Sequence, residues 1–139
     1  MSISNEVRDR VRADAQNRCG YCLSPQRLIL GWLEVEHLCS RAQGGSDEEN
    51  NLWLACRMCN NYKSSQTGGS DPESGDSVPL FNPRVNHWAD HFQWSDDGLY
   101  IVGRTPVGRA TQIALQMNNP IALMVRREWI GAGWHPPND

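Results

Sequence analysis

The stretch "NLWLACRMCNNYK", Asn51 to Lys63, carries two structural signals in one short run. Its apolar part, "LWLAC", predicts a compact strand, and the polar residues from Arg57 onward predict the start of a helix. A Cys-x-x-Cys pair, Cys56 and Cys59, lies at the junction. The fold therefore depends on what the other cysteines of the chain do.

The chain has five cysteines, and four of them form two Cys-x-x-Cys pairs. The N-terminal residues "MSISNEVRDRVRADAQ" are charged throughout and do not resemble an export signal, so disulfides are the less expected use. Two such pairs complete a tetrahedral zinc site, which is closed and structural. We predict structural Zn²⁺ here, with a redox or reduced-thiol role as the alternative. The predicted ligands are Cys19, Cys22, Cys56 and Cys59; the fifth cysteine, Cys39, is expected to be a small apolar filler.

Between the two pairs lies "VEHLCSRAQGG", where Glu36 directly precedes His37 ahead of a polar loop with glycines. A neutral imidazole can take a proton from water, and a carboxylate can hold a divalent ion, so the pair suits metal-assisted hydrolysis. Adjacent side chains of a regular strand point to opposite faces. Both side chains therefore reach one cleft only if the strand ends or bulges at this point, and the glycine-bearing loop favours such an ending.

Taken in order, "CGYC", "EVEHL" followed by "GG", and "NLWLACRMCNNYK" resemble the HNH endonucleases, in the subclass with a four-cysteine zinc site. The resemblance covers about Cys19 to Lys63. It implies an α+β fold in which a small ββα-metal core (the HNH or His-Me finger fold) is braced by the zinc site and carries an α+β C-terminal extension. The segments "PLFNPR", "GRAT" and "RREWI" in the second half resemble the C-terminal extension of a bacterial HNH group, which adds no mechanism.

The resemblance also implies roles for single residues. His37 matches the general base, Glu36 the acidic metal ligand, and Asn51 the asparagine that fixes the loop and orients the histidine. Asn60 matches the second metal ligand, and Lys63 a lysine commonly found one helical turn later. Two oxygen ligands suit a hard ion that keeps several waters, so Mg²⁺ or Mn²⁺ is the expected catalytic ion.

Each of these assignments has a plainer alternative. Asn50 and Asn61 compete with their asparagine neighbours, because asparagine pairs commonly serve turns and helix caps. His87 and His91 lie one helical turn apart, and we expect them to pack beside tryptophans rather than to bind a second metal. The expected nucleic-acid contacts, with ordinary solvation as the alternative, are Lys63, Arg41, Arg126 and Arg127.

The chain is short enough for one domain plus an extension. We expect an HNH nuclease core with zinc knuckles over residues 1–66, a loop or linker over 67–78, and a C-terminal extension packed on the core over 79–139. We expect a helix over 4–17, two short strands or a hairpin over 27–37 that turns near Gly31, a strand over 98–105, and helices over 108–120 and 121–133.

These observations predict a metal-dependent endonuclease that nicks or cuts DNA, with His37 as its general base. A zinc-braced nucleic-acid-binding module without turnover and a protein-interaction domain are the alternatives. The net charge of −3 predicts salt-sensitive binding rather than tenacious binding. No apolar run approaches the roughly 20 residues needed to span a bilayer, so we expect a cytoplasmic protein without a membrane partner.

Overall fold

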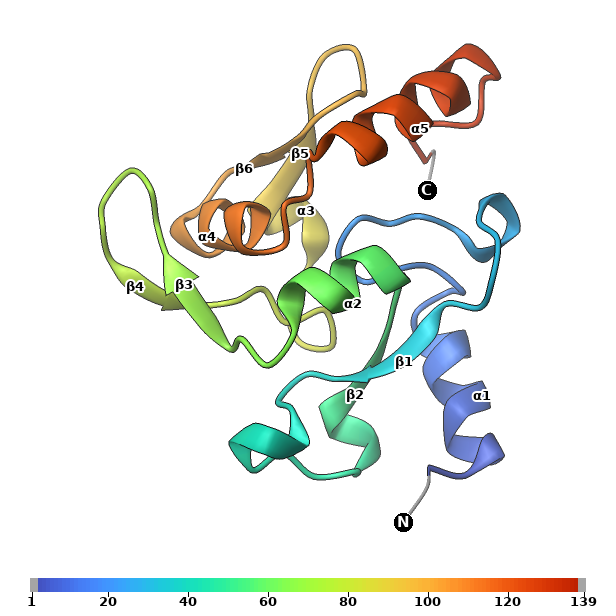
Figure 1. Ribbon diagram of the computed structural model, residues 1–139, viewed down its shortest axis with the longest axis vertical. Helices are drawn as coiled ribbons and strands as arrows, with labels where there is room; N and C mark the ends of the chain where they lie inside the picture. Colours follow the sequence, from blue (N-terminus) through green and yellow to red (C-terminus); the bar gives the residue numbers. More distant parts are fainter. Residues whose placement is uncertain (1–2, 138–139) are drawn as a thin grey trace. The chain divides into compact units, whose positions relative to one another are not determined.

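The computed structural model describes residues 3–137, and its elements are short antiparallel strand pairs and five α-helices within that range (Figure 1). This is the α+β class predicted from the sequence. In chain order the elements are α1 (Asn5–Asp14), η1 (Gln26–Leu28), β1 (Glu34–His37), η2 (Arg41–Gln43), η3 (Glu49–Asn51), β2 (Leu52–Ala55), α2 (Arg57–Lys63), β3 (Gly68–Ser70), β4 (Ser77–Pro79), α3 (Trp88–His91), β5 (Phe92–Trp94), β6 (Ile101–Gly103), α4 (Pro106–Ala114) and α5 (Pro120–Gly131).

The chain divides into two compact units. Unit 1 is Met1–Thr67 with Asn82–Asn86, and unit 2 is Gly68–Phe81 with His87–Asp139. In the described part of the chain, no helix combines the length and the apolar character that a bilayer crossing requires.

Unit 1 is built on the antiparallel pair β1–β2, in which Glu34 lies opposite Ala55 and His37 lies opposite Leu52. Helix α2 follows β2 directly, so the unit has the predicted strand–strand–helix order. Helix α1 packs against β2 and contributes the fully buried Val11 to the core. The N-terminal helix was predicted over 4–17. It ends at residue 14, since the backbone at 16 and 17 has positive φ, which an α-helix does not allow.

The hairpin predicted over residues 27–37 does not form, because only its second half is a strand. Gln26 begins a short 3₁₀ turn, and its side chain takes the place of a partner strand. The Gln26 Nε2 atom donates to the Gly31 carbonyl at 2.8 Å, and the Leu33 N–H donates to Gln26 Oε1 at 2.8 Å. The backbone ahead of β1 is therefore satisfied by one side chain rather than by a ladder.

A distant segment, Asn82–Asn86, returns to unit 1 and is held there by Arg84. The Arg84 Nε atom donates to the Leu52 carbonyl at 3.1 Å, and the guanidinium carbon lies 4.9 Å from the centre of the Trp53 ring. Asp14 at the end of α1 lies 3.5 Å from an Arg84 nitrogen. These contacts join the returning segment to both α1 and β2.

Unit 2 contains the pairs β3–β4 and β5–β6, with α4 packed against strands of both pairs. Thr105 caps the start of α4 and Asn119 caps the start of α5, and a proline occupies the first turn of each helix. The two helices were predicted over 108–120 and 121–133, and the structure has them at Pro106–Ala114 and Pro120–Gly131.

Residues 67–78 were expected to be a loop, but they contain β3 and the beginning of β4.

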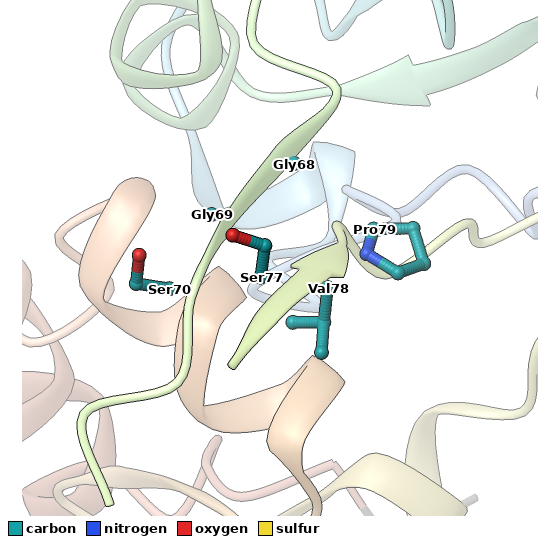
Figure 2. Close-up of a pocket in the computed structure, with 6 residues that line it drawn as sticks. All are labelled: Gly68, Gly69, Ser70, Ser77, Val78 and Pro79. Carbon is teal, nitrogen blue, oxygen red and sulfur yellow. The ribbon is translucent and has the colours of Figure 1, made fainter. Parts of the chain in front are cut away.

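The β3–β4 hairpin borders a cavity of about 420 Å³ (Figure 2). The lining residues are Gly68, Gly69, Ser70, Ser77, Val78 and Pro79. They offer two hydroxyl groups and no ionisable side chain, so the cavity has no group for acid–base or metal chemistry.

Candidate functional site

The four paired cysteines form one buried cluster in unit 1, with their sulfur atoms all within 4.8 Å of one another. The Cys22 and Cys56 sulfurs are 3.7 Å apart. A tetrahedral ion with Zn–S bonds of about 2.3 Å needs sulfurs separated by about 3.8 Å, so this arrangement fits zinc. Within residues 3–137, these cysteines are the one group of three or more His, Cys, Asp or Glu placed to share an ion.

Backbone contacts bring the two cysteine knuckles together. The Gly20 N–H donates to the Leu54 carbonyl of β2 at 2.8 Å, which ties the first knuckle to the strand that leads into the second. Cys56 is the N-cap of α2, and its sulfur accepts from the Cys59 N–H at 3.4 Å. Burial raises the pKa of the Cys19 thiol, whereas hydrogen bonds from the neighbouring thiols lower the pKa of Cys22. A dication is the partner that would stabilise all four as thiolates.

His37 ends β1 and keeps a side chain that is 20% exposed. Its Nε2 atom lies 2.7 Å from Asp47 Oδ1. Asp47 is held in turn by Arg41, which donates to both carboxylate oxygens at 2.9 Å and 2.8 Å. These Arg41 hydrogen bonds, with the contact to His37, hold the pKa of Asp47 below its ordinary value, so its carboxylate is ionised at neutral pH. An ionised carboxylate only accepts, so the Nε2–H group of His37 is the donor in this contact, and Nδ1 is the ring nitrogen left for an acceptor role.

Asn51 fixes the loop that connects β1 to β2. Its Nδ2 group donates to the carbonyls of Cys39 at 2.9 Å and Ser46 at 2.7 Å, and its Oδ1 atom accepts from the Cys39 N–H at 2.9 Å. Gly45 lies where this loop closes, and a Cβ atom there would be 1.8 Å from the Cys39 carbonyl oxygen. One asparagine therefore bonds both ends of the loop that delivers Asp47 to His37.

Glu36 points into unit 1, where it is 3% exposed. The Tyr21 hydroxyl donates to Glu36 Oε1 at 2.5 Å, and Lys63 Nζ lies 3.3 Å from Glu36 Oε2. Lys63 is itself 2% exposed and donates to the carbonyls of His37 and Leu38, both at 3.1 Å. Burial raises the pKa of the Glu36 carboxyl, and the charge of Lys63 opposes that shift.

The expected ligands of a catalytic divalent ion, Glu36 and Asn60, are both engaged by other side chains. Asn60 donates from Nδ2 to Glu34 Oε1 at 2.9 Å, whereas each oxygen of Glu36 has its own partner, Tyr21 or Lys63. The register of β1 is regular at Glu36, which lies opposite Trp53, so no bulge turns its side chain toward the face of His37. As they lie, Glu36 and Asn60 do not fit Mg²⁺ or Mn²⁺.

The basic residues expected at nucleic acid lie in different surroundings. Arg41 is exposed and bonded to Asp47, and Arg127 is exposed on α5. Arg126 is 4% exposed inside unit 2, where it donates to the carbonyls of Leu99 and Met117. Lys63 is likewise enclosed, as described above. Arg126 and Lys63 each hold carbonyl oxygens inside their own unit, and the phosphate contacts expected of them stay predictions.

Sequence reasoning missed two members of the site. Asp47 lies in an acidic, glycine-bearing loop where nothing marks one carboxylate above its neighbours. Tyr21 lies inside "CGYC", where the sequence gives no sign that it is fully buried. Its hydroxyl bonds Glu36 inside unit 1, and this contact is visible only in the structure. In unit 2, His91 bonds Thr105 through Nδ1 at 2.6 Å and packs edge-on against Phe81.

Residues 19–66 match the family model described as HNH endonuclease. The matched segment spans both cysteine pairs, His37 and Asn51. No curated protein and no solved structure matches the chain. The match indicates a nuclease-type or nucleic-acid-interacting function for this segment.

Proposed function

From the HNH endonuclease domain that the chain carries at residues 19–66, we propose that the protein hydrolyses phosphodiester bonds of nucleic acid, with His37 as the general base. The observation that carries this proposal is the contact between His37 Nε2 and Asp47 Oδ1, at the end of a strand braced by the cysteine cluster. That contact leaves Nδ1 free to take the proton of an attacking water, which is the task of a base in phosphodiester hydrolysis.

Each supporting residue has a defined part in this proposal. Asp47 positions the imidazole and stabilises the imidazolium that forms when the ring takes a proton, and Arg41 holds Asp47 in place. Asn51 keeps the loop that carries Asp47 closed against the strand end. Lys63 holds the carbonyl of His37 and so fixes the backbone from which the imidazole projects.

A divalent ion, Mg²⁺ or Mn²⁺, is the cofactor we expect for this hydrolysis, because such an ion neutralises charge that develops on the phosphate oxygens. Glu36 and Asn60 would be its ligands only after Glu36 exchanged Tyr21 or Lys63 for the ion. The roles given above for Asp47, Arg41, Asn51 and Lys63 therefore do not depend on a bound divalent ion. DNA as the substrate, a bacterial source and a cytoplasmic location stay predictions.

The test is a plasmid and oligonucleotide cleavage assay on the zinc-loaded protein with added Mg²⁺ or Mn²⁺. We expect His37→Ala to reduce cleavage by about 10²- to 10⁴-fold, the usual contribution of a general base, while nucleic-acid binding is retained. Asp47→Asn should reduce cleavage less. Glu48→Gln, at the adjacent exposed position, is the matched control and should leave cleavage unchanged. Undiminished cleavage by His37→Ala protein would refute the assigned base.

A zinc-braced binding module without turnover is the second candidate, and the enclosed position of Glu36 favours it. The same assay separates the two functions. A wild-type protein that binds nucleic acid but cleaves nothing with either divalent ion is a binding module.

A further inference from the structure

Two large apolar side chains protrude from unit 1 just ahead of β1. In the loop of residues 29–32, here called the loop tip, Leu30 is 102% exposed and Trp32 is 76% exposed. Tryptophan is enriched at the centres of binding interfaces, since its large flat ring loses much water contact on binding. An exposed tryptophan beside an exposed leucine therefore requires an explanation beyond ordinary surface composition.

Hydrogen bonds from the Gln26 side chain fix the conformation of the loop tip. Gln26 bonds the backbone on both sides of it, at the Gly31 carbonyl and the Leu33 N–H. Gly31 has φ of +80°, a conformation that other residues rarely adopt, and Leu33 directly after the tip is fully buried. A surface that is already ordered loses little conformational entropy on binding. The tip is thus built to present Leu30 and Trp32 rather than to hide them.

Two arginines lie near the loop tip, although the whole chain is acidic. The Arg12 guanidinium carbon lies 5.5 Å from the centre of the Trp32 ring, and Arg27 is exposed in the turn below the tip. The stretch "LSPQRLILGWL", residues 23–33, contains no Asp or Glu. The Arg12 Nη1 atom is buried and makes no hydrogen bond within the described residues. Flat aromatic surface beside arginine is the chemistry that binds nucleobases and their phosphates.

The loop tip is also within reach of the nucleic acid that His37 would act on. Trp32 and His37 are close in sequence, so their Cα atoms are at most about 17 Å apart even if the chain between them is fully extended. With a strand rise of about 3.4 Å per nucleotide, that distance corresponds to about five nucleotides. A bound strand of about five nucleotides would therefore be long enough to span the two residues.

We propose that the loop tip is a stacking surface for unpaired bases of a nucleic-acid strand, with Trp32 providing the platform and Leu30 the apolar edge. This inference rests on the proposed function, in that nucleic acid is the substrate. Stacking of this kind does not depend on base identity, because every base has a π-face. The surface would hold the strand near the scissile phosphate and would not read its sequence.

The test is fluorescence anisotropy of a labelled single-stranded oligodeoxynucleotide, titrated with zinc-loaded full-length protein at low salt and without Mg²⁺ or Mn²⁺. We expect Trp32→Ala to weaken binding about 5- to 150-fold, the range found for loss of one base–aromatic stack. Trp32→Phe keeps a π-face and should retain most of the affinity. Trp134→Ala, which removes a 52% exposed tryptophan from unit 2, is the matched control and should bind like the wild type.

Equal affinity of Trp32→Ala and wild-type protein would overturn the inference, provided that circular dichroism and zinc content show both to be folded. A wild-type dimer that Trp32→Ala converts to monomer without loss of oligonucleotide binding would also overturn it, since a second copy would then cover the tip. Failure of the proposed function looks different: wild-type protein would bind the oligonucleotide through Trp32 yet cleave nothing with either divalent ion.

Discussion

Replacing Lys63 with methionine tests whether this lysine belongs to the interior of unit 1 or to the nucleic acid. The ammonium group has three donors, and the structure gives it three acceptors: Glu36 Oε2 and the carbonyls of His37 and Leu38. Methionine has similar length and no charge. The Lys63→Met protein would keep the Glu36 carboxylate buried with Tyr21 as its remaining bonded partner, and two carbonyls would lose their donor.

Removing one partner of a buried ion pair costs about 3–5 kcal/mol, because the other charge stays enclosed. A typical domain has only about 5–15 kcal/mol of stability, so Lys63→Met should lower the free energy of unfolding by a large fraction. The measurement is urea unfolding followed by circular dichroism, with zinc at one saturating concentration for every variant. The Glu36→Gln/Lys63→Met double variant should lose less than the sum of the two single losses, because the two sites interact.

Arg57→Met is the matched control on the same helix. Arg57 is 83% exposed and lies 3.9 Å from Glu34, so its loss should cost at most about 1 kcal/mol. If Lys63→Met cost no more than Arg57→Met but weakened nucleic-acid binding, Lys63 would be a phosphate contact and the interior ion pair would be refuted.

Two further predictions concern the cysteine cluster and unit 2. Purified protein should release one zinc ion per chain to a thiol-reactive mercurial reagent, and Cys56→Ser should lower both the zinc content and the free energy of unfolding; a zinc-free wild-type protein of equal stability would contradict the site. The Arg109 guanidinium, with the Ser74 hydroxyl, holds the pKa of Asp71 well below its usual range. The stabilisation from this pair is therefore complete above the ordinary aspartate pKa of about 4 and is lost as the pH falls below it. The free energy of unfolding of the wild type should therefore decline between about pH 5 and pH 2 more steeply than that of Asp71→Asn. Urea unfolding at each pH measures the difference.

The parts of the fold that the sequence predicted correctly depend on local spacing. Two Cys-x-x-Cys pairs lead to one cluster because each pair is already a two-point ligand, and "LWLAC" before Cys56 and Cys59 gives a strand that runs directly into a helix. These features need no knowledge of distant contacts. The hairpin at 27–37 was wrong because Gln26, a residue with no strand or turn signature, satisfies the backbone ahead of β1.

The candidate site was harder to predict because its pairings join residues that the sequence separates. Lys63 reaches Glu36 from α2, and Tyr21 reaches it from the first cysteine knuckle. The sequence cannot distinguish a buried lysine from a solvated one, because the order of polar and apolar residues on a short helix does not show which polar side chain turns inward. Arg126 is a similar case, because its charge is satisfied by carbonyls that become neighbours only in the folded unit.

The sequence suggested that Glu36 is the acid partner of His37, but in the structure the partner is Asp47. Strand geometry explains the difference. Glu36 and His37 are adjacent in a strand of regular register, so their side chains leave opposite faces. The inner face takes Glu36 into a neutralised interior cluster, and the outer face leaves His37 to a carboxylate from the following loop, Asp47. Asn51 allows Asp47 to reach His37, because its hydrogen bonds close the loop that carries Asp47 over the end of the strand. The His37 side chain is therefore positioned by Asp47 and Asn51, and Glu36 is linked to it through Lys63, which also bonds the His37 carbonyl.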